Sequence, residues 1–255
     1  MKQLELFESA PRVNLIDYTG AGRPDERDYA ANLLLFTKST RLEMTPTLMS
    51  KIRALTDDER AASLDYMANT IPSSWEFVDV TFLISGLSRA CAQQVTRTRT
   101  ASFAMQSQRV TDVSEADVVN PYDSGHELYN VYNDRAGKIK VHYTAMLASG
   151  AEPQDARGLL PMNTQCNLVA KYNLRSLVEL VVARSSLRTQ GEYAQIVDQM
   201  KSAVLRIWPW SRPFFEPRHD KAVRLLEELA AEVGVETGNG TGWQLAKIAD
   251  LLRKG

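Results

Sequence analysis

Residues 97–109, which read RTRTASFAMQSQR, contain the side chains whose types and spacing could do chemistry. Three arginines, two serines and two glutamines occur in this one short segment. Their guanidinium, hydroxyl and amide groups are hydrogen-bond donors that can converge on a phosphate or another polyanionic ligand. The segment therefore predicts an anion-binding loop. The alternative is a solvated basic helix face or a nucleic-acid patch.

Two features of the sequence favour the binding loop over the nucleic-acid patch. The basic residues are interleaved with small and apolar ones, such as Ala101 and Phe103, and the segment follows a strongly apolar element. The whole chain has a formal net charge of −1, so its overall field does not attract nucleic acid. We therefore expect local arginines to hold the anion, and we expect no nucleic-acid partner.

A predicted strand and a predicted helix position this segment. Apolar residues alternate through residues 75–85, which predicts a strand with one buried face. The alternating residues are Val78, Val80, Phe82 and Ile84. Gly86 is expected to stop this strand, and Ser88 is expected to cap a helix that runs to Val95. That helix delivers Gln94 one turn before the first arginine.

The rest of the chain mixes short strands with helices, which indicates an α/β (α+β) protein with a central sheet and flanking helices. A strand is expected at 13–18, an extended or mixed stretch at 162–170, and an irregular stretch or edge strand at 110–120. Helices are expected at 27–36, after the capping residues Thr45 and Thr56, at 126–147 with an interruption at Gly137, and along the apolar stripes of 174–181 and 193–204. Two amphipathic helices, 221–233 and 243–252, complete the prediction.

The length of 255 residues is sufficient for one domain with a sizeable core. We expect a single domain over 1–255, with a C-terminal helical extension at about 214–255. No apolar run approaches the roughly 20 residues of a membrane span, and the N-terminus lacks a leader pattern, so we expect a cytoplasmic protein with no membrane partner. Two cysteines and three histidines predict neither a disulfide framework nor a metal site.

Cys91 and Cys166 are predicted to be packing residues. Cys91 lies on the small, apolar side of the helix that follows Ser88, and Cys166 lies among neutral residues. A reactive thiolate needs a cationic or basic neighbour. The sequence therefore predicts chemistry that does not use a cysteine nucleophile.

The order of residues in 97–109 resembles the signature of the flavin-dependent thymidylate synthases, which begins R-H-R and closes with S-x-R. The matching positions are Arg97, Arg99, Ser102, Ser107 and Arg109. The resemblance extends, with a gap in the middle, over about residues 75–192. It includes Gln94; Asp155-Ala156-Arg157 with Leu160-Pro161; Asn173-Leu174-Arg175-Ser176-Leu177 with Arg184; and Gln190 with Glu192.

This resemblance implies an α/β enzyme that assembles as a homotetramer, with each site built by several chains around FAD. The implied reaction is methylation of C5 of a uridine nucleotide monophosphate, which converts dUMP to dTMP or UMP to 5-methyl-UMP. The implied cosubstrates are 5,10-methylenetetrahydrofolate, which supplies the one-carbon unit, and NADPH, which reduces the flavin. Members of the family need no cysteine nucleophile, which agrees with the interpretation of the two cysteines.

The resemblance also implies roles for individual residues. Residues implied to bind the nucleotide are Gln94, Arg97, Gln106, Ser107, Gln108, Arg109, Arg157 and Arg184. Residues implied to bind the flavin are Arg97, Thr98, Arg99, Thr100, Asn173 and Glu179. The implied catalytic set is Arg184, Ser107 and Arg157: an arginine near the uracil carbonyls stabilises the negative charge that develops when C5 becomes a nucleophile, and the serine is a positioning donor.

Several positions depart from the usual pattern. Thr98 replaces the histidine of the motif, Ala104 and Met105 replace a polar pair, Glu179 replaces an amide or histidine, and Phe77 replaces the histidine after Glu76. One hypothesis is a specialised branch that methylates UMP, as in nucleoside-antibiotic pathways, or that hydroxymethylates the uracil. An ordinary dUMP methylase is a close competitor. A non-catalytic relic that binds flavin or nucleotide is a further alternative.

Overall fold

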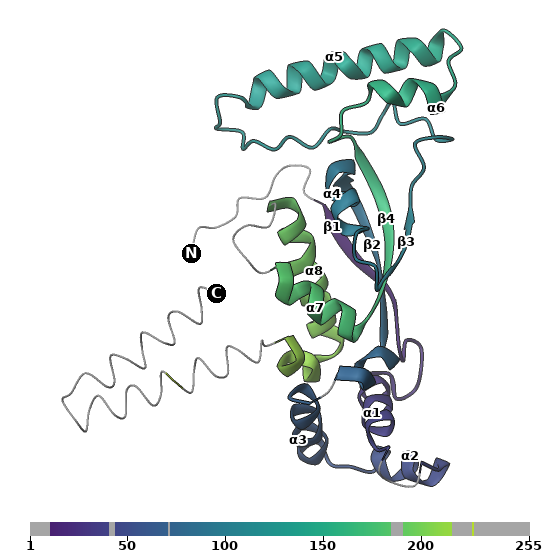
Figure 1. Cartoon of the computed structure of the whole chain (residues 1–255), viewed down its shortest axis with the longest axis vertical. Coiled ribbons are helices and arrows are strands. Elements are labelled where there is room, and N and C mark those ends of the chain that lie inside the picture. Colours follow the sequence, from purple (N-terminus) through teal and green to yellow (C-terminus); the bar gives the residue numbers. More distant parts are fainter. Residues whose placement is uncertain (1–10, 41–43, 71, 185–190, 216–225, 227–255) are drawn as a thin grey trace, which may run out of the picture.

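The computed structural model describes residues 11–40, 44–70, 72–184, 191–215 and Leu226, and the helices predicted at 221–233 and 243–252 lie outside these ranges. A four-stranded antiparallel sheet forms the centre of the described chain (Figure 1). The strands in spatial order are β1 (Arg12–Tyr18), β2 (Asp79–Ser88), β4 (Gln165–Asn173) and β3 (Ser102–Met105). The expected central sheet with flanking helices is therefore confirmed.

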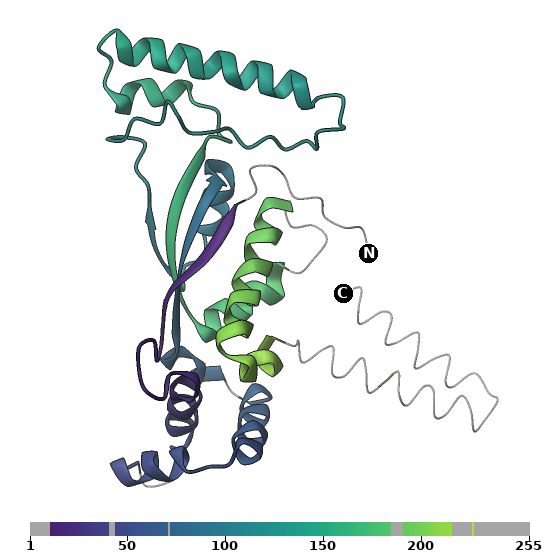
Figure 2. The same ribbon diagram turned by 180° about the vertical axis from the view of Figure 1, so that it is seen from behind.

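Three helices cover one face of this sheet, as the two opposite views show (Figures 1 and 2). They are α4 (Arg89–Val95), α7 (Leu174–Arg184) and α8 (Gly191–Ile207). The alternating residues of the central strands point toward them and are fully buried, including Phe82, Ile84 and Leu168. The apolar stripes of α7 and α8 meet these strand residues in one core, which confirms the alternation and the helical stripes predicted from the sequence.

The opposite face of the sheet is more open. Asn167 and Lys171 of β4 and Ala104 of β3 are exposed there, and Leu83 and Val169, which pair across β2 and β4, are only half-buried. Successive residues of each strand therefore point alternately into the core and toward the open face. Within the described residues, one face is a closed core and the other is an exposed surface of mixed polarity.

A group of helices lies at one end of the sheet. It comprises α1 (Glu26–Lys38), α2 (Pro46–Arg53) and α3 (Asp57–Ala68), followed by the 3₁₀ helix η1 (Pro72–Phe77). Thr56 and Glu59 form the predicted capping box at the start of α3. The strand predicted from residue 75 begins only at Asp79, because Trp75 belongs to η1, where its ring packs edge-on against Phe214 with centroids 4.9 Å apart.

A second helical group lies beyond the other end of the sheet (Figure 1). It contains α5 (Tyr129–Ala148), α6 (Pro153–Ala156) and the 3₁₀ helix η2 (Arg157–Leu159). Gly137 does not interrupt α5, contrary to the prediction: the glycine is exposed, and a helix tolerates it at the cost of about 1 kcal/mol relative to alanine. Within the described residues, no helix is both long enough and apolar enough to cross a bilayer.

Candidate functional site

Part of the segment predicted as a loop is a strand. Residues Ser102–Met105 form β3, which pairs antiparallel with β4. Phe103 faces the helical layer, where its ring packs edge-on against Tyr172 with centroids 5.9 Å apart, whereas Ala104 lies on the open face. β3 separates the two halves of the segment, because Thr100 precedes it and Ser107 follows it, and its four residues span roughly 13 Å at about 3.3 Å per residue.

A bulge in β2 sets the start of α4. Gly86 was expected to stop this strand, but β2 continues to Ser88, and the pairing with β4 shifts register between Ile84 and Leu87. Gly86 has a φ of +72°, which suits glycine, and its N–H donates to the side-chain oxygen of Asn167 at 3.1 Å. The glycine therefore introduces a bulge rather than an end.

Ser88 connects three elements at this point. Its Oγ accepts a hydrogen bond from the Cys91 N–H at 3.0 Å and so caps α4 as predicted. Its own N–H and Oγ–H donate to the two carboxylate oxygens of Glu192, each at 2.6 Å. Removal from water raises the pKa of Glu192, against the opposing effect of these two bonds. Glu192, known from the sequence only as a motif position, thus joins α8 to the helix that carries Gln94.

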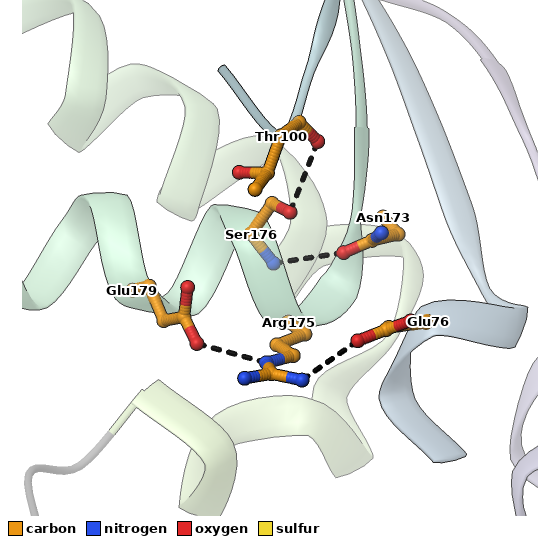
Figure 3. A network of polar contacts seen from close by, with 6 residues as sticks. All are labelled: Glu76, Thr100, Asn173, Arg175, Ser176 and Glu179. Carbon is orange, nitrogen blue, oxygen red and sulfur yellow. Dashed lines mark hydrogen bonds and ion pairs between the residues drawn. The ribbon is translucent and has the colours of Figure 1, made fainter. Parts of the chain in front are cut away.

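Three of the residues predicted to bind flavin lie together at the start of α7, in a group that we call the α7 cluster (Figure 3). Ser176 donates from Oγ to the carbonyl oxygen of Thr100 at 3.1 Å and from its N–H to the side-chain oxygen of Asn173 at 2.8 Å. Arg175 donates to Glu179 at 2.9 Å and to Glu76 at 2.7 Å. The cluster consists of Glu76, Thr100, Asn173, Arg175, Ser176 and Glu179. It joins the arginine-rich segment to α7.

Arg97, Thr98 and Arg99 lead into this cluster from α4. The Arg97 N–H donates to the carbonyl oxygen of Gln94, and the Thr98 N–H donates to that of Val95, each at 3.2 Å, so the chain turns immediately after the helix. The side chains of Arg97 and Arg99 are exposed. Neither has an ion-pair partner among the residues that the structure describes.

The donor set of this region fits the group that its residues are predicted to hold. Two uncompensated guanidinium groups suit the pyrophosphate of FAD, and the side chain of Asn173 suits ring carbonyl oxygens. Glu179 would repel a pyrophosphate as a bare anion. Its carboxylate is instead bound by Arg175, which also binds Glu76. The acidic replacement at residue 179 is therefore compatible with an anionic cofactor.

A second group lies at the other end of β3, and we call it the α6 cluster. The Arg109 N–H donates to the Oγ of Ser107 at 3.1 Å, and Arg109 Nε donates to the side-chain oxygen of Gln154 at 3.1 Å. Arg157 Nε donates to the carbonyl oxygen of Gln154 at 3.2 Å. Arg109 and Gln154 line a cavity of about 400 Å³ together with Val110, Glu152 and Pro153. Two exposed guanidinium groups thus both donate to Gln154, and the backbone of Arg109 binds Ser107.

The sequence prediction missed Gln154 as a member of this cluster. It precedes Arg157 by three residues, which places both side chains on one face of a helical turn. That spacing was the available signal. Gln154 accepts from Arg109 through its side-chain oxygen and from Arg157 through its backbone carbonyl, and so orients both of these predicted nucleotide ligands.

Two of the three predicted glutamines, Gln106 and Gln108, lie beside this cluster with different roles. The N–H of Gln106 donates to the carbonyl of Asn167 at 2.9 Å, and its side-chain oxygen accepts from the Asn167 N–H at 3.3 Å, so it extends the pairing of β3 with β4. Gln108 is buried, and its Nε2 has no hydrogen-bond partner among the described residues. An unpaired buried amide of this kind is available to a ligand.

Arg184 lies in neither cluster. It ends α7, and its guanidinium carbon is 5.0 Å from the centre of the Tyr193 ring in α8. Its Nε is buried and has no hydrogen-bond partner within the described chain. Apart from Gln94 on α4 and Gln106 and Gln108 beside the α6 cluster, the predicted site residues of a single chain therefore form three groups. They are the α7 cluster with Arg97, Thr98 and Arg99, the α6 cluster, and Arg184 on Tyr193.

The two cysteines are core residues, as predicted. Cys91 and Cys166 are both buried. Burial raises the pKa of the Cys166 thiol to about 11, and burial together with the Glu192 carboxylate raises the pKa of Cys91 further above the ordinary range. Neither side chain is a thiolate at neutral pH, so neither is a nucleophile.

The chain is similar in sequence to proteins of a known family. Residues 14–210 match the family model Thy1, described as thymidylate synthase complementing protein. A flavin-dependent thymidylate synthase of Halobacterium salinarum is 28% identical over 207 residues, which cover 69% of this chain and 84% of that protein.

Two solved structures share the fold. The UMP/dUMP methylase PolB of Streptomyces cacaoi, bound with 5-Br dUMP, has a TM-score of 0.63 at 18% identity and covers 82% of this chain and 96% of its own. Thymidylate synthase X of Helicobacter pylori, with FAD and dUMP, has a TM-score of 0.60 at 20% identity and covers 81% and 97%. At these identities the likeness concerns the fold.

Proposed function

Because the chain belongs to the thymidylate synthase complementing protein family, that of the flavin-dependent thymidylate synthases, we propose that it methylates C5 of a uridine nucleotide monophosphate. FAD, reduced by NADPH, supplies the electrons of this reaction when bound, and 5,10-methylenetetrahydrofolate supplies the carbon. The observation that carries the proposal is the α6 cluster. Arg109 and Arg157 come from segments 48 residues apart, yet both donate to Gln154.

The α6 cluster binds the nucleotide phosphate in this proposal. A phosphate dianion accepts several charge-assisted hydrogen bonds, and guanidinium groups provide them in a planar, bidentate form. Arg109 is the principal ligand because it is exposed at the cavity and Gln154 fixes its Nε. The Ser107 Oγ accepts a hydrogen bond from the Arg109 N–H. Its own proton therefore remains available for a phosphate or sugar oxygen.

The α7 cluster, with Arg97, Thr98 and Arg99, binds the flavin. Arg97 and Arg99 are exposed and have no carboxylate partner within the described residues. Ser176 holds Thr100 and Asn173 in fixed positions through two hydrogen bonds. The protein positions the flavin and the pyrimidine ring against each other, which accounts for much of the catalysis in such two-substrate chemistry.

Arg184 supplies the electrostatic part of the chemistry. A pyrimidine C5 becomes nucleophilic as negative charge develops on the ring and its carbonyl oxygens. A guanidinium group near those oxygens stabilises that charge and remains protonated throughout. Arg184 suits this role because its Nε is desolvated and has no hydrogen-bond partner in the described part of the chain. No cysteine takes part.

We further propose that the enzyme is a homotetramer whose sites are shared between chains. The α6 and α7 clusters lie at opposite ends of β3, and Arg184 lies at the end of α7 away from the α7 cluster, so in this proposal a second copy completes each site. Exposed apolar side chains of α5 and its surroundings provide a surface for that copy. They are Val131, Ile139, Val141, Met146, Leu159 and Met162, and Ile139, Met146 and Leu159 line a cavity of about 820 Å³.

The nucleotide preference is the finer part of the proposal. Ala104 replaces a polar residue of the motif. It follows Phe103 directly in β3 and is exposed on the open face of the sheet. A methyl group at this position removes a donor that would otherwise restrict the sugar edge. We propose that the enzyme therefore accepts UMP as well as dUMP, with transfer of a methyl group. Hydroxymethylation is the competing outcome for the transferred carbon.

One product assay tests the proposal. The purified protein is incubated with FAD, NADPH and methylenetetrahydrofolate together with dUMP or UMP, and the product mass is measured. We expect both substrates to give a nucleotide in which a methyl group replaces the C5 hydrogen, a net gain of CH2. A large preference for dUMP refutes the use of UMP, and a net gain of CH2O, which indicates a hydroxymethyl group, refutes methyl transfer. A colourless protein with no affinity for FAD refutes the enzymatic proposal itself.

A further inference from the structure

Arg184 lies against an aromatic ring that belongs to the next helix. The guanidinium carbon is 5.0 Å from the centroid of Tyr193, within the roughly 6 Å that defines a cation–π contact. Tyr193 is completely buried, whereas Arg184 is only half-buried. The ring is therefore a fixed support in the core, and the arginine extends from that support toward the surface.

The phenol group of Tyr193 contributes no hydrogen bond to this contact. Its hydroxyl is buried and has no partner among the described residues, and the same is true of Arg184 Nε. The interaction between the two residues is therefore through the π face of the ring. A phenylalanine would keep this face and would remove a buried hydroxyl that is unpaired within the described chain.

The turn that carries Tyr193 is fixed by its preceding residue. Glu192 accepts two hydrogen bonds from Ser88, and Ser88 in turn caps α4. The first turn of α8 thus contacts the start of the helix leading to Arg97 through Glu192 and the end of α7 through Tyr193. One short piece of backbone therefore contacts both α4 and Arg184.

We infer that Tyr193 is a positioning residue for Arg184: its ring holds the guanidinium in one orientation before the nucleotide binds. A free arginine side chain samples many rotamers, and a ligand that recruits it must order it. The ring reduces that loss and keeps Arg184 ready for the pyrimidine carbonyls. This inference rests on the proposed function, because it assumes that Arg184 contacts the nucleotide.

The test measures the dissociation constant of dUMP and UMP by calorimetry on the full chain loaded with FAD. Tyr193→Met fills the core with a flexible apolar side chain but removes the π face. We expect binding on the order of 10-fold weaker. Tyr193→Phe should bind within about twofold of the native protein, since it keeps the ring.

A double-mutant cycle separates positioning from general packing. In an Arg184→Ala background, Tyr193→Met should cause no further loss of affinity, because the residue it positions is absent. The matched control is Phe214→Met, which removes a buried ring from η3 and should leave nucleotide binding unchanged. If Tyr193→Met does not fold, Tyr193→Leu takes its place in the cycle.

The possible outcomes distinguish the inference from the proposed function. If Arg184→Ala leaves the dissociation constant unchanged, Arg184 is not in the site and the premise is wrong. If Arg184→Ala weakens binding but Tyr193→Met does not, or if the two losses add in the double variant, the positioning role of Tyr193 is overturned. Loss in Tyr193→Met, rescue in Tyr193→Phe and no additivity together support it.

Discussion

Glu192 binds Ser88 through both carboxylate oxygens, with one bond from the backbone N–H and one from the hydroxyl, each at 2.6 Å. Desolvation still raises the pKa of this carboxyl group above its ordinary value of about 4.3. When the pKa of a carboxyl group is higher in the folded state than in the unfolded state, the protonated form of the group stabilises the folded state. Its contribution to stability is therefore present at low pH and is lost as the pH rises through the folded-state pKa.

This relationship predicts how Glu192→Gln changes the pH dependence of stability. Glutamine keeps an acceptor and a donor for Ser88 but does not titrate. We expect the free energy of unfolding of the native protein, minus that of Glu192→Gln, to be higher at about pH 4, near the ordinary carboxyl pKa, than at about pH 8. Urea denaturation at both pH values measures it. Glu127→Gln, at an exposed position, should show no such change, and parallel curves for Glu192→Gln would contradict the prediction.

The α6 cluster predicts a phosphate-specific effect at Arg109. Arg109→Ala should weaken binding of dUMP or UMP by about 1.5 to 3 kcal/mol, the value of one charge-assisted hydrogen bond. The same variant should bind deoxyuridine, which lacks the phosphate, about as well as the native protein does. Calorimetry with both ligands measures the difference. Arg135→Ala, 74% exposed on α5, is the control, and an equal loss for nucleotide and nucleoside would remove Arg109 from the phosphate site.

Two neighbouring departures from the family motif should respond differently to a polar substitution. Ala104 is exposed on the open sheet face, so Ala104→Asn should change the free energy of unfolding by less than about 0.5 kcal/mol. Met105 packs against the main core, so Met105→Asn should destabilise by about 1 to 3 kcal/mol. Urea denaturation compares the two. We also expect Ala104→Asn to shift turnover from UMP toward dUMP, and an unchanged ratio would exclude Ala104 from sugar selection.

Local pattern predicted much of this fold. The alternation of Val80, Phe82 and Ile84 indicated the central strand, and Thr56 with Glu59 indicated the start of α3, because both signals depend on residues close in sequence. The Gly86 bulge was taken for an end, since a glycine signals either. β3 was missed because its four residues lie within an arginine-rich motif, where side-chain chemistry obscured the alternation.

The sequence proposed a set of site residues but not their arrangement. The family resemblance proposed Arg109 from the arginine motif and Arg184 from the end of the helix after Asn173, whereas their partners Gln154 and Tyr193 are contacts set by tertiary packing. The distribution of the set over three groups follows from β3, which separates Thr100 from Ser107. A linear motif contains no information about that separation, and none about which groups meet across a subunit boundary.

The proposed sharing of sites predicts that two inactive variants restore each other. Arg157→Ala alters the α6 cluster, and Arg184→Ala removes the residue on Tyr193; each should lower activity by a factor on the order of 10 to 100, as expected for the loss of one charge-assisted bond. If a site takes these two arginines from different chains, a mixed tetramer contains some sites in which both are native. Mixing the variants and allowing subunits to exchange should therefore recover activity above that of either one.

The mass of the assembly is the control for this complementation. The native protein should sediment at four times the 28.6 kDa of one chain. Val141→Asp places a charge on the apolar surface of α5, where Val141 is 68% exposed, and should lower the mass and abolish complementation, while Tyr66→Asp, on α3, should not. A native protein that sediments as one chain contradicts the tetramer. A tetramer in which the mixed variants stay inactive shows instead that each site draws Arg157 and Arg184 from the same chain, since exchange between chains would otherwise have reunited them.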